Sequence, residues 1–308
     1  MKNNDESKLT AFMFVLVPTL FVIIGIFYFP HRYTDAELNL ISIPLFISLI
    51  FLGIGALFKK EKISNILKII GWVGFAFFWS TQINALFYGE EGDYVNAFIC
   101  SAGLYFFMYF AYHEWLSIKR NEKIGCLNWL AGATAISGFI YFGIELTPLE
   151  MWLREVVAAQ SGWVLNLVVG GGVETIGVNI RYGDASVFII FACTGIQAMV
   201  LFVGMILPLS KASFKNRFYG LLITVVPVYF LNLLRNALVV FLVAANGPDY
   251  FWMAHNVIGK GGGLIVLIIL LFFVIKILPE IFDEINSVID LPKRNGPIER
   301  VFSKMLGK

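Results

Sequence analysis

Three residues of this chain have side chains that stand out chemically from their long apolar surroundings: Cys193, Arg235 and His255. A cysteine thiolate is a strong nucleophile, and a histidine beside it can accept the thiol proton and later return it to a leaving amine. Arginine stays protonated, so Arg235 is suited to hold an oxyanion, a carbonyl or a carboxylate and not to act as a base. These residue types predict acyl transfer through a thioester.

Arg235 is the most unusual of the three because it interrupts the apolar run 218–245. An arginine deep in a membrane segment costs about 2.5–3.5 kcal/mol on insertion scales, and such residues usually mark function. Taken one at a time, the three also have ordinary interpretations. A buried cysteine is usually a small hydrophobe, an intramembrane arginine is often half of an ion pair, and a histidine at a helix end is often a polar cap. Chemistry is favoured only if the three residues lie together.

The composition identifies an integral membrane protein, since 58% of the residues are hydrophobic and only 14% are charged. Its apolar runs are long enough for helices and lack the alternation of a membrane barrel. The sequence predicts an all-α polytopic membrane protein, one integral membrane domain over 1–308 with about eight transmembrane helices. The predicted spans are 11–29, 39–58, 66–87, 94–115, 124–144, 187–207, 218–245 and 255–278.

The connections between these spans alternate in charge, and the positive-inside rule then fixes their orientation. Both termini are expected in the cytoplasm, with the tail 279–308 a solvated anchor near anionic lipid head groups. This places every Lys and Arg on the cytoplasmic side except Arg32, Arg154, Arg181, Arg235 and Lys260.

With this topology, depths can be compared between three consecutive helices. Cys193 is six residues inside the outer end of 187–207, or roughly 9 Å along a helix, and Arg235 is ten residues inside its own outer end, or roughly 15 Å. His255 opens the last span. We therefore expect a multi-pass cell-membrane protein whose catalytic helices, 187–263, place the three side chains at the extracytoplasmic face.

Two amides are expected beside these residues. Gln197 follows Cys193 by four residues and Asn232 precedes Arg235 by three, spacings that share a helix face. Both are candidates for orienting the reacting groups.

The extracytoplasmic segment 145–186 is expected to contain regular secondary structure and not to be an ordinary polar loop. It begins with a proline-containing helix start and continues as an apolar stretch with two tryptophans, which predicts a helix lying in the outer interface. A triple glycine then precedes alternating residues around 173–182, which predict a strand or small β-hairpin.

Several other function classes are disfavoured. A net charge of +2 gives no argument for nucleic acid, and the three cysteines, Cys100, Cys126 and Cys193, have no metal-binding spacing. The glycines around Lys260 lack the pattern of a phosphate loop. We expect no metal and no cofactor. Cys100 also falls in the outer third of its span, but nothing around it resembles a site, with Ala97, Phe98 and Ala102 beside it.

Three short motifs of this chain resemble the exosortase/archaeosortase family of membrane proteins, most of all its archaeosortase A group. They occur in the family's order and spacing, mainly within 187–263. The motifs are Ala192-Cys193-Thr194-Gly195-Ile196-Gln197, Asn232-Leu233-Leu234-Arg235-Asn236 and His255-Asn256-Val257-Ile258-Gly259.

The resemblance implies a sortase-like cysteine transpeptidase without the soluble sortase fold. Its partners would be the C-terminal sorting-signal helix of exported surface-layer proteins, with a Pro-Gly-Phe-type motif before the helix and a basic tail after it, and a membrane lipid that accepts the new C-terminus. Cys193 would be the nucleophile, Arg235 the family's arginine and His255 the third member, as base or as substrate-binding group. Substrate-binding or site-orienting roles would fall to Thr194, Gln197, Asn232, Asn236 and Asn256.

Two other functions suit an intramembrane arginine. An anion or small-molecule transporter would bind its cargo at Arg235, but it would be expected to show inverted repeats and broken helices near the midplane, and no repeat is evident. A lipid head-group transferase would use the same outer site without a peptide substrate.

Overall fold

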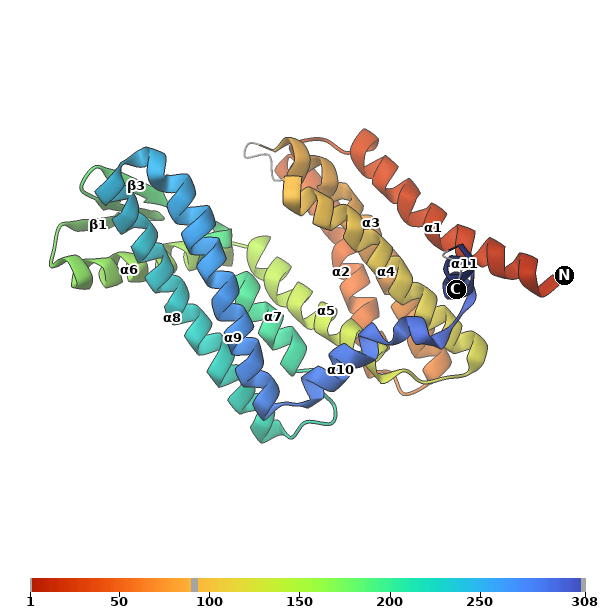
Figure 1. Ribbon diagram of the computed structural model, residues 1–308. Coiled ribbons are helices and arrows are strands. Elements are labelled where there is room, and N and C mark those ends of the chain that lie inside the picture. Colours follow the sequence, from red (N-terminus) through yellow and green to blue (C-terminus); the bar gives the residue numbers. More distant parts are fainter. Residues whose placement is uncertain (1, 90–93, 306–308) are drawn as a thin grey trace. The chain divides into compact units, whose positions relative to one another are not determined.

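The computed structural model describes residues 2–89 and 94–305, and helices dominate this part of the chain (Figure 1). Within it, seven helices are long and apolar enough to cross a membrane, and an eighth apolar helix, Ile196–Ile206, is shorter. A three-stranded antiparallel sheet follows the helix Leu149–Val169. These elements confirm the predicted fold class. The protein is an all-α polytopic membrane protein with one additional helix and a small β element between its spans. The orientation of the termini stays a prediction.

The chain forms two compact units. The first comprises residues 1–135 and 284–308, and the second residues 136–283. The first unit contains α1 (Lys2–Tyr28), α2 (Asp35–Leu57), α3 (Glu61–Tyr88), α4 (Tyr94–Arg120), the first half of α5 (Gly125–Glu145), the end of α10 (Glu280–Ile289), the 3-10 helix η4 (Leu291–Arg294) and α11 (Pro297–Met305).

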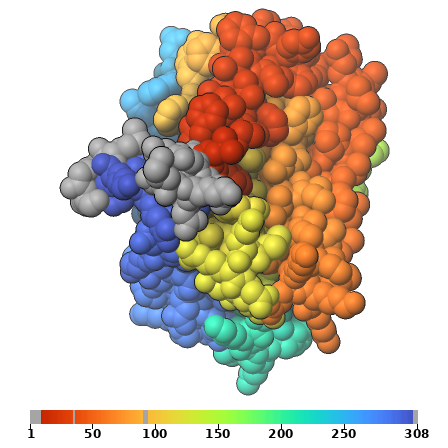
Figure 2. Space-filling model, turned by 90° about the vertical axis from the view of Figure 1, so that its right-hand side faces the viewer, coloured from red at the N-terminus to blue at the C-terminus, as the bar shows by residue number. Residues whose placement is uncertain are grey.

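Close helix packing holds α2, α3 and α4 together. Gly71 of α3 lets α2 approach, because a Cβ added there would lie 2.7 Å from a side-chain carbon of Leu52. Trp72 is fully buried, and its ring lies 6.0 Å from that of Phe107 and 5.2 Å from that of Phe110. The outer surfaces of α1 and α2, on the face seen in Figure 2, expose apolar side chains as lipid-facing helices do.

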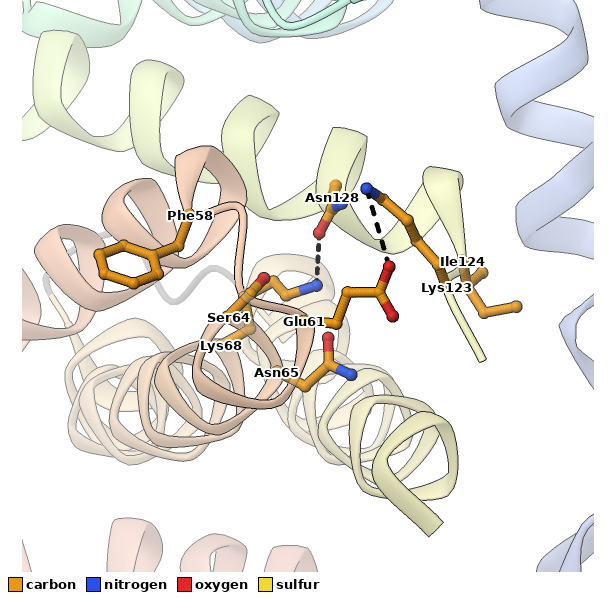
Figure 3. A pocket seen from close by; sticks show the side chains of 8 residues that line it. All are labelled: Phe58, Glu61, Ser64, Asn65, Lys68, Lys123, Ile124 and Asn128. Carbon is orange, nitrogen blue, oxygen red and sulfur yellow. Dashed lines mark hydrogen bonds and ion pairs between the residues drawn. The ribbon is translucent and has the colours of Figure 1, made fainter. Parts of the chain in front are cut away.

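A buried ion pair joins α3 to α4. Lys68 Nζ lies 2.9 Å from Glu114 Oε1, and the two side chains are only 2% and 0% exposed. The same ammonium group donates to Asn128 Oδ1 of α5, in a small pocket that Glu61 and Lys123 also line (Figure 3). This cation is therefore balanced inside the protein.

The C-terminal segment is helical and packed as far as the structure describes it, to Met305, whereas we expected a solvated tail over 279–308. The hydroxyls of Tyr109 and Tyr112 donate to the Glu299 carboxylate at 2.7 and 2.9 Å, and His113 Nε2 lies 3.4 Å from it. Arg294 donates to the carbonyl of His113 at 3.0 Å. Burial opposes the charge of Glu299, but hydrogen bonds from His113, Tyr109 and Tyr112 outweigh it and lower the pKa of this carboxyl to about 2.

The second unit holds the motif residues. It contains the end of α5, α6 (Leu149–Val169), β1 (Val173–Ile176), β2 (Asn179–Tyr182), β3 (Ala185–Phe188), the 3-10 helix η1 (Phe191–Thr194), α7 (Ile196–Ile206), α8 (Phe214–Asn246), the 3-10 helix η2 (Pro248–Tyr250), the π-helix η3 (Met253–Lys260), α9 (Gly261–Ile277) and the start of α10.

The sheet closes one end of this unit, next to α6 and the adjoining end of α8 (Figure 1). β1 pairs with β2 and β2 with β3, with Val173 opposite Tyr182 and Tyr182 opposite Ala185. A buried apolar cluster joins α6, the sheet and α8. Its members are Val157, Ala158, Leu165, Ile180, Val187, Ile189, Cys193, Leu233, Ala237 and Val240.

The predicted continuous helix over 187–207 is wrong. Residues 185–188 pair with β2 as strand β3, and the chain then passes through η1 before α7 begins at Ile196. The β-branched residues of 187–190 suit a strand, and Gly195 adopts φ 76°, a left-handed conformation that interrupts any helix. The predicted proline-containing helix start is present, with Pro148 as the N-cap of α6. The hydroxyl of the preceding Thr147 donates to the carbonyl of Gly143 in α5 and does not cap α6.

Candidate active site

Cys193 lies in the short 3-10 helix η1, between the last strand of the sheet and α7. Its amide donates to the carbonyl of Ile190 at 2.8 Å, and the residue is only 6% exposed. Gly195 completes the turn, because its positive φ favours glycine and a Cβ added there would lie 2.9 Å from Cγ of Asn232. The cysteine is therefore a buried residue on a tight turn, three residues before the first residue of a helix.

Two asparagines of α8 hold the backbone of this turn. The side-chain amides of Asn232 and Asn236 donate to the carbonyl oxygen of Cys193 at 2.8 and 3.0 Å. They are four residues apart, so one face of α8 supplies both donors. Asn236 also lies 3.4 Å from the hydroxyl oxygen of Ser161, a buried residue of α6. The site-orienting position expected for both asparagines therefore corresponds to direct contact with the cysteine backbone.

Gln197 lies elsewhere than expected, whereas Thr194 belongs to the cysteine turn itself. The expectation that Gln197 shares a helix face with Cys193 was wrong, because the left-handed Gly195 separates η1 from α7. Gln197 is exposed, and its amide donates to the hydroxyl of Tyr141 at 3.2 Å. Thr194 is fully buried and donates to the carbonyl of Phe191 at 2.7 Å, which stabilises the 3-10 turn.

Arg235 lies on α8 between the two asparagines and packs against the π-helix η3. A Cβ added to Gly259 would lie 2.9 Å from Arg235 Nε, so the guanidinium occupies the space above this glycine. Nε is buried without a hydrogen-bond partner, and no ion pair joins Arg235 to a carboxylate of the described residues. Unlike Lys68, this cation has no balancing anion in the described part of the protein.

His255 lies in the π-helix that also carries Gly259. Its imidazole stacks on Phe251, with ring centroids 5.3 Å apart and an interplanar angle of 10°, and the charges of Arg235 and Lys260 act on it. Asn256 is half-buried in the same helix. Wide π-turns are rare and occur frequently at functional sites. The structure thus places His255 within electrostatic range of Arg235, on the π-helix against which Arg235 packs, and it ties Cys193 to the helix from which Arg235 projects.

Several residues of this region were not predicted. Tyr141 of α5 lies against the cysteine turn, with its ring 5.2 Å from that of Phe191, and its hydroxyl donates to Glu145 Oε1 at 3.0 Å. Arg154 of α6 donates from Nε to the carbonyl of Ile189 at 2.8 Å. Both lie outside the three motifs, so only the folded chain reveals them. In the described ranges, 2–89 and 94–305, no cluster of three or more His, Cys, Asp or Glu residues suits a metal ion.

These features lie within a stretch that matches a known family. The family model described as transmembrane exosortase matches residues 72–274, which is more than half of the chain and includes the region from Cys193 to His255. The chain therefore belongs to the exosortase family of transmembrane proteins, as the three motifs indicated.

A curated relative gives a more particular similarity. The chain is 23% identical over 269 residues to archaeosortase A of Haloferax volcanii, and the alignment covers 75% of this chain and 86% of that protein. No solved structure matches the chain. The membership and the helices together describe a multi-pass membrane protein of the exosortase/archaeosortase type.

Proposed function

We propose that this protein is a membrane-embedded cysteine transpeptidase that processes the C-terminal sorting signal of exported proteins. The signal would combine a Pro-Gly-Phe-type motif, an apolar helix and a basic tail. The new C-terminus would pass through a thioester on Cys193 to an amine in the head group of a membrane lipid. The family membership and the similarity to an archaeosortase support this class of reaction.

The single observation that carries the proposal is the unbalanced charge of Arg235. A guanidinium in an apolar segment without a carboxylate partner has no structural reason to be there, whereas an oxyanion that forms during acyl transfer would supply the missing negative charge. Its helix also holds the carbonyl of Cys193 through Asn232 and Asn236. One rigid element thus links the proposed nucleophile to the proposed oxyanion-binding group.

The first half of the reaction uses these groups in order. His255 accepts the proton of the Cys193 thiol, and the thiolate adds to the carbonyl carbon of the scissile peptide bond. The carbonyl oxygen becomes an oxyanion facing Arg235. When the intermediate collapses, the carbon–nitrogen bond breaks, the amine leaves with the proton held by His255, and the acyl group remains on sulfur as a thioester.

The surroundings favour an amine over water as the second reactant. Cys193 packs in the apolar cluster formed by α6, the sheet and α8, and exclusion of water from a thioester slows its hydrolysis. A substrate anchored by its own helix would arrive by lateral diffusion, which suits an outer interface. Location of the site at the extracytoplasmic face is part of the proposal.

The test uses the full chain in lipid nanodiscs with a reporter protein that ends in such a signal. Mass spectrometry of the reporter measures cleavage and identifies its new C-terminus. We expect Cys193→Ala to abolish cleavage and Cys100→Ala to retain it, because Cys100 is an equally buried cysteine of α4 whose sulfur lies 3.1 Å from the carbonyl of Trp79. Wild-type cleavage by Cys193→Ala would overturn the proposal, and a free carboxylate as sole product would exclude transfer to an amine.

A further inference from the structure

Glu145 resembles Arg235 in being a half-buried charged residue that forms no ion pair with another described residue. It is the last residue of α5 and half-buried, and its Oε1 accepts a hydrogen bond from the Tyr141 hydroxyl at 3.0 Å. No Lys, Arg or His of the described residues forms an ion pair with it. The neighbouring Glu150 adds a like charge, and Arg154 is already bound to Glu150 at 3.1 Å. This corner of the unit therefore carries unbalanced negative charge.

The same corner is joined directly to the cysteine turn. Tyr141 accepts a hydrogen bond from Gln197, in the first turn of α7, and its ring lies 5.2 Å from that of Phe191, the first residue of η1. Ser137 of α5 donates to the carbonyl of Val200 at 2.8 Å, which is a second hydrogen bond between α5 and α7. The turn with Cys193 thus has α8 with its unbalanced cation as one neighbour and α5 with its unbalanced carboxylate as another.

We propose that Glu145, with Tyr141 and Gln197, binds the ammonium group of the incoming acceptor and takes a proton from it. This inference rests on the proposed function and names the residues for its second half. An ammonium has three hydrogen-bond donors, and the carboxylate, the phenol oxygen and the amide oxygen of Gln197 are three acceptors. A partly buried carboxylate without a cation is costly in the resting protein, and a bound ammonium would remove that cost.

The proton and electron balance of this step is complete. The bound ammonium gives one proton to Glu145 and becomes a neutral amine, and its nitrogen attacks the thioester carbon. A carbon–nitrogen bond forms, the carbon–sulfur bond breaks, and Cys193 leaves as a thiolate. A second proton from the nitrogen passes through His255 to that thiolate, and one hydrogen stays on the new amide. No metal, oxidant or further reactant is needed.

Glu145 also explains how one small site serves two reactants of opposite electrostatic character. The acyl donor develops an oxyanion, which suits Arg235, whereas the acceptor arrives as a cation, which suits Glu145. The two charges do not form an ion pair with each other in the described structure, so each is available to its own reactant.

The test compares two nucleophiles on the full chain in nanodiscs with the same reporter. Propylamine is mostly protonated at neutral pH and needs a group that binds and deprotonates it, whereas hydroxylamine is mostly uncharged. We expect Glu145→Gln to lower the ratio of propylamide to hydroxamate product at least tenfold. The matched control, Glu155→Gln, removes the same charge from an exposed residue of α6 and should leave the ratio unchanged.

An unchanged ratio in Glu145→Gln overturns the inference while the proposed function stands. Cleavage that persists in Cys193→Ala is a different result, and it would overturn both the proposed function and this inference. The source of the ammonium is addressed by two further arms, vesicles containing phosphatidylethanolamine and soluble triglycine. Amide formation that requires the vesicles and depends on Glu145 identifies a lipid head group, and formation with triglycine alone identifies a peptide amine.

Discussion

Replacing Arg235 by methionine separates a functional cation from a structural one. Lys68 serves as the matched comparison, since each substitution removes one positive charge from a membrane helix and leaves an unbranched apolar side chain. Lys68 is paired with Glu114 at 2.9 Å, whereas Arg235 has no carboxylate partner in the described residues. The two variants should therefore change stability in different directions.

The expected magnitudes follow from these environments. Lys68→Met strands the buried carboxylate of Glu114, and breaking a buried pair in this way costs about 3–5 kcal/mol. Arg235→Met strands nothing and removes a group whose insertion costs about 2.5–3.5 kcal/mol, so its free energy of unfolding should stay level or rise by up to about 3 kcal/mol. The same Arg235 variant should lose processing of the reporter.

Reversible unfolding of the full chain in lipid bilayers measures both free energies on one scale. A destabilisation by Arg235→Met as large as that by Lys68→Met would refute the reasoning, because it would mean that Arg235 stabilises the fold through a partner of its own. A stable variant without activity would instead show that the fold tolerates an unbalanced cation for the sake of the reaction.

Two further predictions follow from single contacts. Gly259→Ala should lower the turnover of the reporter at least tenfold, because the new Cβ would lie 2.9 Å from Arg235 Nε. The thermal stability of this variant should stay level or rise, since alanine favours helices. The control Gly262→Ala has open space around its new Cβ and should match the wild type in both turnover and thermal stability. For Glu299, whose pKa falls from 4.5 to about 2 on folding, the stabilisation of α11 is fully present above about pH 4.5 and lost as pH falls towards 2, a change of about 3 kcal/mol. Amide hydrogen exchange of residues 297–305 should measure this loss as weaker protection at low pH. Glu299→Gln has no carboxyl to titrate, so protection that still increases with pH through this range in the variant would contradict the prediction.

The sequence predicted most of the helices because a membrane span leaves a strong record of twenty or so apolar residues. The prediction of one continuous helix over 187–207 was wrong. The strand, the 3-10 turn and the short helix in this range are all apolar, so their mean hydropathy equals that of a single membrane span. The deciding features were pairing of residues 185–188 with β2 and the left-handed Gly195, and neither follows from apolar content. The depth estimate for Cys193 assumed a helix there and was wrong for the same reason.

The sequence indicated only those residues of the candidate site whose side-chain type is unusual for their apolar surroundings or whose position belongs to a motif. Cys193, Arg235 and His255 stand out as polar residues in apolar runs. Asn232 follows from its spacing to the arginine, and Asn236 from the motif that carries the family resemblance. Tyr141 lies near the end of the predicted span 124–144 and Glu145 directly follows it. A tyrosine and a glutamate are ordinary at a membrane interface, so nothing local marks them. The contacts of Tyr141 with η1 and α7 depend on packing between segments that are 50 and 56 residues apart in the chain.

The two hydrogen bonds from α8 to the Cys193 carbonyl have a consequence for motion. They fix the peptide plane on the carboxyl side of Cys193, and the hydrogen bond from the Cys193 amide to the carbonyl of Ile190 restrains the other side. With the backbone held in this way, the sulfur can change position chiefly by rotation about the Cα–Cβ bond, which moves it along a short arc. In the proposed reaction the backbone of the nucleophile therefore does not move towards the substrate. The substrate's carbonyl must be delivered to that arc, and the accuracy of delivery, more than the reactivity of the thiol, would set the rate.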